Sequence, residues 1–284
     1  RIGDQHGPEY AILSPRSFSS SATPDIWYAQ HPVILSGIMN RFEFGIESWN
    51  VWTPDSDQDG TDSEDRGQGE ALAKNAVDLS AFPAMLRRRL SKPGKTALHT
   101  ILQLKDNLPE EIPTVFSSHY GEVERSVSLL NSLAHGEPLS PTDFSLAVHN
   151  AVAGVYSIGC KQHSNMNAIS AGSGGFTMGL VEACGLLLEH DYVLCVDYGS
   201  PLPEPYENTS NQEEYPYAIA MLISKTGADQ VQIFQTRVPD DTGDVEPDSF
   251  PPDQLINFLN KKNNHFRLKS GNALWNFQRN NNEQ

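Results

Sequence analysis

The sequence predicts an α/β protein built on a layered α-β-α sheet. Short apolar runs that are typical of buried strands recur along the chain, for example YVLCVDY (192–198) and YAIAMLIS (217–224). Segments with apolar residues at helical spacing lie between such runs. Strands that alternate with helices favour a layered sheet over an all-helical or all-β protein, and 284 residues suffice for a large core.

Residues 1–38 are rich in Ser and Pro and show no sustained period. We expect them to form a poorly patterned N-terminal extension, partly disordered, outside a single domain over residues 39–284. They lack the basic start and continuous apolar block of a secretory signal. Within the domain, Phe42, Phe44 and Ile46 alternate with polar residues, which predicts a strand before an acidic loop over 54–70.

Helical signals follow the acidic loop. Ser80 is a candidate cap for a helix that ends before Pro93 and Gly94, and a second helix is expected over 96–104. The run PTVFSS (113–118) predicts a buried strand, and the next helix is expected over 122–134.

The most strongly specified helix begins at Ser140, followed by Pro141 in the first turn and the capping acid Asp143. Its apolar period continues to residue 155, so the pattern predicts one helix over 140–155. A strand should then lead into a tight turn at 171–175 and a helix to residue 188. Three strands (192–198, 217–224 and 231–237), a short helix from 252 and a polar C-terminal tail complete the chain.

The charge excludes some functions. The formal net charge is -16, and nucleic acid is an unsuitable partner for a chain that mostly lacks a basic surface. No apolar run approaches the roughly 20 residues of a membrane span. The three cysteines lie in apolar contexts without ligand spacing, which indicates buried thiols in a reducing, cytoplasmic compartment.

The segment DSDQDG (55–60) matches the first half of a calcium-binding loop. The twelfth position of such a loop holds a glutamate that binds calcium with both oxygens, but here it is Arg66. We therefore interpret the segment as a solvated acidic loop and expect no metal site there.

The tight turn Ala171-Gly172-Ser173-Gly174-Gly175 is a candidate catalytic feature. It fits the nucleophile-elbow pattern of hydrolases, with Ser173 as nucleophile and His265 downstream as the base. Small residues around a serine are, however, required by any sharp strand-to-helix turn, and His265 lies in a polar run typical of a surface. A serine hydrolase or acyltransferase that uses Ser173 is the alternative hypothesis.

Two stretches carry a family resemblance. SPTDFSLAVHNAVAGVYSI (140–158) resembles a helix of β-ketoacyl synthases, and NAISAGSGGFTMGLVEA (167–183) resembles their active-site elbow. Further segments, including FPAMLRRRLS and the region around Trp275, are similar to the short chain length factors of bacterial aryl polyene pathways. The resemblance covers about residues 39–279 and implies the N-terminal half of the thiolase/ketosynthase fold.

Aligning Ser173-Gly174 with the family's Ser-Gly places Ala171 where the catalytic cysteine would be. A methyl group cannot take up an acyl chain, and the family's two histidines have no counterpart here. The resemblance therefore implies a non-catalytic subunit without a cofactor, which pairs with a full-length β-ketoacyl synthase and shapes its acyl pocket. An acyl carrier protein would then meet the complex through the partner.

In this family, the strand entering the elbow pairs with its counterpart in the other subunit, which implies an interface around residues 164–169. The alternative is an ordinary internal strand. Asn165 and Asn167 would be costly to bury without polar partners, which an interface can supply. The full set of interface and pocket candidates is His149, Asn150, Asn165, Met166, Asn167, Ile169, Ser170, Ala171 and Ser173.

Overall fold

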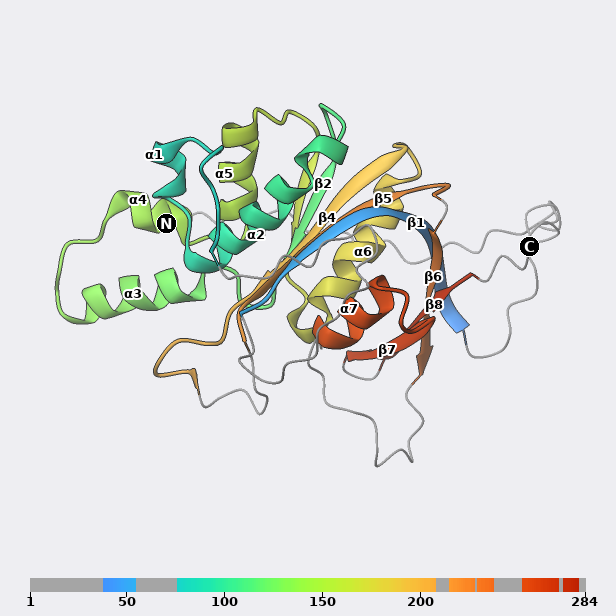
Figure 1. Cartoon of the computed structure of the whole chain (residues 1–284). Coiled ribbons are helices and arrows are strands. Elements are labelled where there is room, and N and C mark those ends of the chain that lie inside the picture. The colour runs from blue at the N-terminus through green and yellow to red at the C-terminus, as the bar shows by residue number, and fades with distance from the viewer. Residues whose placement is uncertain are drawn as a thin grey trace, which may run out of the picture. The chain divides into compact units, whose positions relative to one another are not determined.

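The computed structural model describes residues 38–54, 76–207, 215–227, 229–237, 252–270 and 273–280. These residues belong to one compact unit, Gly37–Gln284 (Figure 1). The expected N-terminal extension and nearly all of the acidic, calcium-like loop lie outside the described residues.

A single eight-stranded sheet in the order β3-β2-β4-β5-β1-β6-β8-β7 organises the unit. Strand β3 pairs in parallel with β2, and β2 in parallel with β4, whereas every other pair is antiparallel. The strands are β1 (Ile38–Trp52), β2 (Thr114–Ser117), β3 (Met166–Ile169), β4 (Tyr192–Gly199), β5 (Tyr217–Ser224), β6 (Asp229–Arg237), β7 (His265–Ser270) and β8 (Ala273–Arg279).

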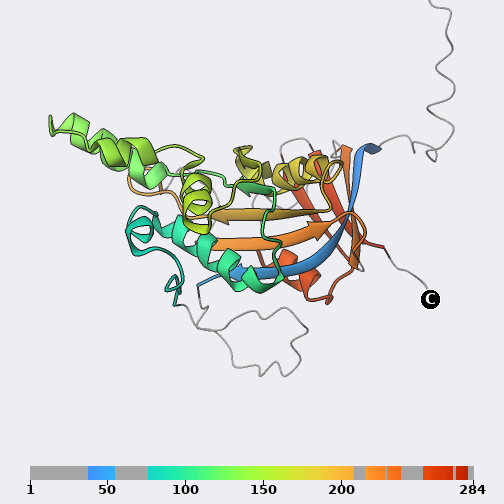
Figure 2. The same cartoon turned by 90° about the horizontal axis from the view of Figure 1, so that it is seen from above.

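Helices lie against both faces of the sheet (Figures 1 and 2). They are α1 (Ala84–Arg87), α2 (Lys92–Gln103), α3 (Val123–Ala134), α4 (Pro141–Leu146), α5 (Ala151–Cys160), α6 (Gly175–Leu186) and α7 (Pro252–Leu259). Two short 3-10 helices, η1 (Lys105–Asn107) and η2 (Gly172–Gly174), complete the elements. The layered α/β class predicted from the sequence is confirmed.

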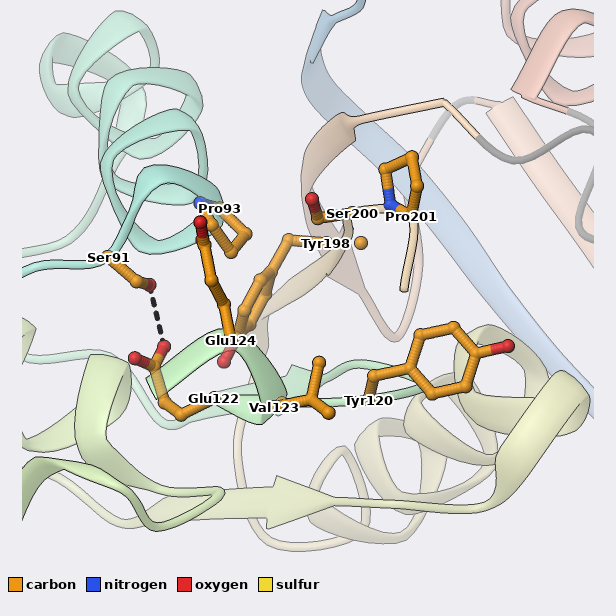
Figure 3. Close-up of a pocket in the computed structure, with 11 residues that line it drawn as sticks. Ser91, Pro93, Tyr120, Glu122, Val123, Glu124, Tyr198, Ser200 and Pro201 are labelled. Atoms are coloured by element: carbon orange, nitrogen blue, oxygen red, sulfur yellow. Dashed lines mark hydrogen bonds between the residues drawn. The ribbon is translucent and has the colours of Figure 1, made fainter. Parts of the chain in front are cut away.

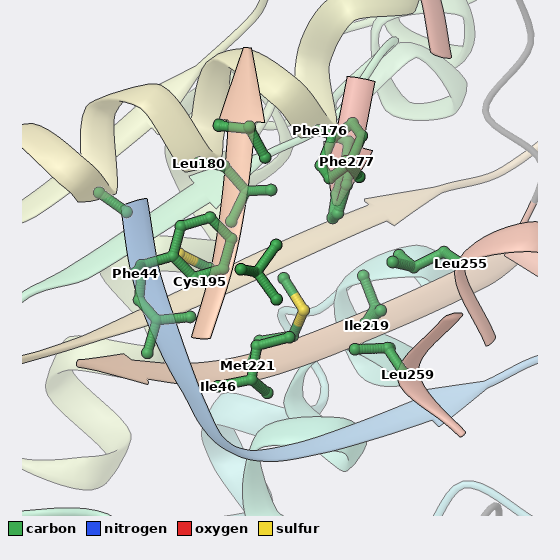
Figure 4. Close-up of a cluster of buried hydrophobic side chains, with 14 of the residues drawn as sticks. Phe44, Ile46, Phe176, Leu180, Cys195, Ile219, Met221, Leu255, Leu259 and Phe277 are labelled. Carbon is green, nitrogen blue, oxygen red and sulfur yellow. The ribbon is translucent and has the colours of Figure 1, made fainter. Parts of the chain in front are cut away.

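The sheet separates two hydrophobic cores. Helices α6 and α7 pack on one face, where Phe176, Leu180 and Leu255 meet strand residues such as Phe44 and Phe277 (Figure 4). Helices α2 and α5 pack on the other face around buried residues that include Leu98, Phe116, Val152, Tyr156 and Leu194. The elbow helix α6 and the helix α5 therefore lie on opposite faces of the sheet.

The predicted continuous helix over 140–155 is wrong, because the chain breaks between α4 and α5. The Ser140 hydroxyl accepts a hydrogen bond from the Asp143 N–H, as the capping signal predicts. Within the break, the His149 ring Nε2 lies 2.7 Å from the Ile169 carbonyl oxygen, a contact across the chain that a local pattern cannot show. The apolar period continues through the break and conceals it.

Two further boundaries differ from expectation. Pro93 and Gly94 lie in the first turn of α2 behind the cap Ser91, because a proline in the first turn needs no N–H donor there. The polar C-terminal tail forms the hairpin β7–β8, in which Trp275 and Phe277 are buried. The polar residues that face outward from this hairpin hide, in the sequence, the alternation of apolar and polar residues that would indicate strands.

Candidate functional site

The site forms where three parallel strands end. Strand β3 ends at Ile169, the chain turns at Ser170 and Ala171, and η2 leads directly into α6. Ala171 is half-buried and occupies the residue before η2, so it lies at the strand-to-helix corner predicted for it. The side chain at this corner is a methyl group.

Glycine is required at one position of the elbow and at one position of the helix that follows it. Gly172 has φ +55°, a left-handed conformation that side chains rarely adopt. Gly179 lies against β2, where a Cβ atom would be only 2.8 Å from the Ser117 hydroxyl oxygen. The first glycine therefore permits the turn, and the second lets α6 pack closely on the sheet.

A buried carboxyl group lies beneath the elbow helix. Asp197 of β4 is 4% exposed and accepts hydrogen bonds from the Ser117 hydroxyl at 2.5 Å and the Tyr217 hydroxyl at 2.7 Å. Burial raises the pKa of Asp197 to about 7, and the two hydroxyl donors oppose that rise. Through these two hydrogen bonds, the Asp197 carboxyl group connects β4 to β2 and β5 just below the turn.

His149 has a structural contact at the elbow. Its Nε2–H donates to the Ile169 carbonyl at 2.7 Å, and its Nδ1 lies beside Gly121. The Ser118 backbone N–H also donates to the Ile169 carbonyl, at 3.3 Å. The imidazole therefore attaches the α4–α5 break to the end of β3, while Asn150 beside it is exposed.

The geometry does not pair Ser173 with His265, the base of the hydrolase alternative. The imidazole beside the elbow is that of His119, whose Nε2 lies 3.9 Å from the position that a Cβ atom on Gly172 would take. Ser270 is the β7 residue beside Gly174, and His265 lies at the opposite end of that strand, about 17 Å away at strand spacing. His265 is exposed there and does not face the elbow.

An open groove of about 860 Å³ runs along β3 and α5. On its β3 side, Met166 and Ala168 belong to the face that carries α5, whereas Asn167 and Ile169 belong to the α6 face. Asn165, Ser170, Ala171 and Ser173 lie near the groove but do not line it. The lining residues are His149, Asn150, Ala153, Gly154, Ser157, Gln162, His163, Ser164, Met166, Asn167, Ala168 and Ile169.

The outer edge of β3 has no neighbouring strand among the described residues. The Asn165 and Ile169 carbonyls accept from the Thr114 and Ser118 N–H groups, so alternate residues of β3 face β2. The backbone groups of Met166 and Ala168 therefore point to the open edge. The internal-strand alternative does not hold for this segment in the described structure.

Asn165 and Asn167 differ in burial and in their hydrogen-bond partners. Asn165 is exposed, so the cost of burying it does not arise in the isolated chain. The Asn167 side chain is half-buried and donates to the Glu182 carboxylate of α6 at 2.5 Å. No local pattern in the sequence marks Glu182, because only the fold brings the two residues together.

Large apolar side chains are exposed along residues 130–158. Of the ten large apolar side chains exposed in the described part of the chain, six lie between residues 130 and 158. Figure 2 shows α3 and α4 extending away from the layers of the sheet. The residues of this apolar arm are Leu130, Leu133, Leu139, Phe144 and Val148, whereas the sixth residue, Ile158, lies on α5.

A second, smaller cavity lies between the start of α2 and the ends of β2 and β4 (Figure 3). The buried Glu122 carboxylate there accepts from the Ser91 hydroxyl at 2.7 Å and from Arg125 at 3.4 Å. The free volume of this cavity is about 20 Å³, which suits a water molecule and is too small for an acyl chain. No sequence signal singled out Glu122.

The three cysteines are poor candidates for a nucleophile. Burial raises the pKa of the Cys160 thiol to about 11 and that of Cys184 to about 12, and raises the pKa of Cys195 well above its usual value. Such thiols carry almost no thiolate at neutral pH.

Within the described ranges, no group of three or more residues that could hold a metal ion lies together. No helix in these ranges is long and apolar enough to cross a membrane.

A parallel strand that runs into a glycine-rich elbow and a buried helix defines an α/β protein with an elbow of the kind on which enzymes carry a nucleophile. A family model described as the N-terminal domain of β-ketoacyl synthases matches residues 61–278. The chain belongs to this family. The family resemblance predicted from the sequence is thereby confirmed. A search of curated proteins found no significant match to the chain.

The chain was also compared with solved structures. The chain is similar to a complex of a ketosynthase (ApeO) with its chain length factor (ApeC) from Xenorhabdus doucetiae, with 25% identity and a TM-score of 0.65. The alignment covers 83% of this chain and 99% of the matched chain. An ishigamide ketosynthase/chain length factor matches at 13% identity and a TM-score of 0.44, over 65% of this chain and 59% of the other.

Proposed function

We propose that this chain is a non-catalytic, chain-length-factor-like subunit that pairs with an active β-ketoacyl synthase and shapes its acyl pocket. The pathway would be polyene or fatty-acid-like biosynthesis. The single observation that carries the proposal is Ala171 at the strand-to-helix corner. Acyl transfer needs a nucleophile at that point, and a methyl group has no lone pair with which to attack a thioester.

The partner would add a strand to the open edge of β3. The outward-facing N–H and C=O groups of Met166 and Ala168 offer backbone hydrogen bonds for such an addition. This arrangement would bring the elbow of each subunit close to the other. It would also cover the groove between β3 and α5.

The edge of β3 alone is too small for a stable complex. Four residues extend about 14 Å, whereas a stable interface buries about 800 Å² on each partner. The apolar arm supplies further surface, and it is continuous with the groove because Val148 adjoins the groove residue His149. We assign the arm to the same ketosynthase partner.

The comparison with the complex from Xenorhabdus doucetiae supports the pairing. The matched chain is aligned over 99% of its length to 83% of this chain, so it is shorter than this chain. A short chain of this fold in a complex with a ketosynthase is the arrangement that we propose here. Acyl carrier protein would bind mainly to the partner, because an acidic carrier is repelled by a chain of formal net charge -16.

The test is co-expression with a ketosynthase of the same pathway, followed by size-exclusion chromatography and product analysis by mass spectrometry. We expect a 1:1 complex, no condensation by the chain alone, and a changed product length when groove residues are enlarged. Acylation of the isolated chain and extension of a malonyl thioester would overturn the proposal. A fluorophosphonate adduct on Ser173 would support the hydrolase alternative instead.

A further inference from the structure

The hydrogen bond between Asn167 and Glu182 places a carboxylate beside the open edge of β3. The Asn167 amide donates to the Glu182 Oε1 atom at 2.5 Å. Both side chains lie on the α6 face of the sheet, where Ile169 also packs. No lysine, arginine or histidine in the described ranges forms an ion pair with Glu182. Its charge is therefore not neutralised within the described chain.

A two-fold axis would bring this carboxylate close to its own copy. Two copies of β3 that pair across their open edges run antiparallel, and opposite residues must point to the same face. Over four residues, this allows Asn167 to lie opposite Asn167 of a second copy, or Ala168 opposite Ala168. In either register, the two Asn167 residues are about 4.5–8 Å apart, and each holds a Glu182.

We infer that Glu182 selects the partner by opposing self-pairing of this chain. Two uncompensated carboxylates in one interface repel each other, and repulsion between like charges is a recognised source of partner specificity. The favoured partner is a ketosynthase-like subunit that presents a neutral or cationic side chain at the position related by the two-fold axis. This inference rests on the pairing through β3 proposed above.

The test uses two variants of the full chain. Glu182→Gln removes the charge and retains an oxygen that accepts from Asn167, so its fold should be preserved. We expect the homodimer association constant, measured by analytical ultracentrifugation, to rise about tenfold or more over wild type. An increase in salt should strengthen self-association of the wild type more than that of Glu182→Gln, because the high negative net charge repels in both proteins and only the wild type adds the local repulsion at Glu182.

A charge swap provides the second measurement. Wild type mixed with Glu182→Lys should form a 1:1 pair, whereas each protein alone stays largely monomeric, since only the mixture joins opposite charges. If the Gln variant and the mixture self-associate no more than wild type, or if wild type already forms a β3-mediated homodimer, the inference is overturned. Failure of wild type to bind any ketosynthase would instead refute the proposed function, which the ketosynthase co-purification measures separately.

Discussion

The Tyr217 hydroxyl donates a 2.7 Å hydrogen bond to the Asp197 carboxylate at the floor of the elbow. The Ser117 hydroxyl donates to the other carboxylate oxygen, so both oxygens are satisfied without a cation. Desolvation nevertheless dominates and raises the pKa of Asp197 to about 7. The ionisation of one carboxyl group is therefore coupled to the geometry of three strands.

This coupling predicts a pH-dependent stability. The folded state binds a proton at Asp197 up to about pH 7, whereas an unfolded Asp loses it near pH 4. The free energy of unfolding should thus fall as pH rises between these values, by about 1.4 kcal/mol for each pH unit from this group. Asp197→Asn should remove that part of the slope, measured by urea unfolding from pH 5 to 8.

A matched control is Glu137→Gln, which neutralises an exposed carboxyl group. This variant should keep the wild-type slope. If Asp197→Asn and wild type lose stability in parallel from pH 5 to 8, Asp197 does not titrate in this range.

Restoring a thiol at the elbow should create a reactive cysteine. In Ala171→Cys, the new side chain would lie at a half-buried corner just before η2 and α6, where helix N–H groups stabilise a thiolate. Alkylation by iodoacetamide under native conditions should be at least about tenfold faster at this position than at Cys184 or Cys195, whose pKa values burial raises. Peptide mass spectrometry over time gives the rates.

The three native cysteines serve as internal standards within the same molecule. Equal labelling of the introduced thiol and the native thiols in the folded Ala171→Cys variant would show that the corner is closed to solvent. Unfolding in urea should make all four react at similar rates.

The open edge of β3 can be tested with two prolines in adjacent positions. Ala168→Pro removes an N–H that points to the open edge, so pairing with β2 should survive while binding of the ketosynthase weakens at least about tenfold. Asn167→Pro removes an N–H that faces β2, and should lower the melting temperature instead. Calorimetry and the dissociation constant of the complex distinguish the two effects. Unchanged binding by a folded Ala168→Pro variant would argue against strand addition.

Much of the fold could be predicted from the sequence because its signals are local. The apolar strands at β4 and β5 and the capping signals at Ser140 and Pro141 depend on residues close in the chain. The elbow at Ala171 was also predictable, since only small residues fit a sharp turn. The break before α5 was not, because a contact between His149 and the distant Ile169 accompanies it.

The candidate site was predictable only in part. Residues of the β3 segment were named from the family resemblance, and the structure places that strand at the edge of the sheet. Glu182, Glu122 and Asp197 were missed because their roles depend on partners 15 to 80 residues away. Asp197 did carry a local signal, an acid inside the apolar run YVLCVDY, which on its own indicates a buried polar group with partners.

Arg125 should be a main support of the apolar arm. It donates to Asp143 at 2.6 Å, to the Arg89 carbonyl at 3.0 Å and to Glu122 at 3.4 Å, and so joins α3 to α4 and to the segment before α2. The Glu122 side chain is only 2% exposed. Arg125→Met would leave this carboxylate buried with the Ser91 hydroxyl as its remaining side-chain donor. We expect a loss of about 2–4 kcal/mol in the free energy of unfolding, measured with urea.

The ion pair between Lys92 and Glu124 provides the comparison. Its N–O distance is 3.7 Å and the Lys92 side chain is 86% exposed, so Lys92→Ala should cost less than about 0.5 kcal/mol. The double variant Arg125→Met/Glu122→Gln should be more stable than Arg125→Met alone, because it removes the isolated buried charge as well. Equal losses for Arg125→Met and Lys92→Ala would mean that the arm is held by apolar contacts, and that the charges at its base contribute little.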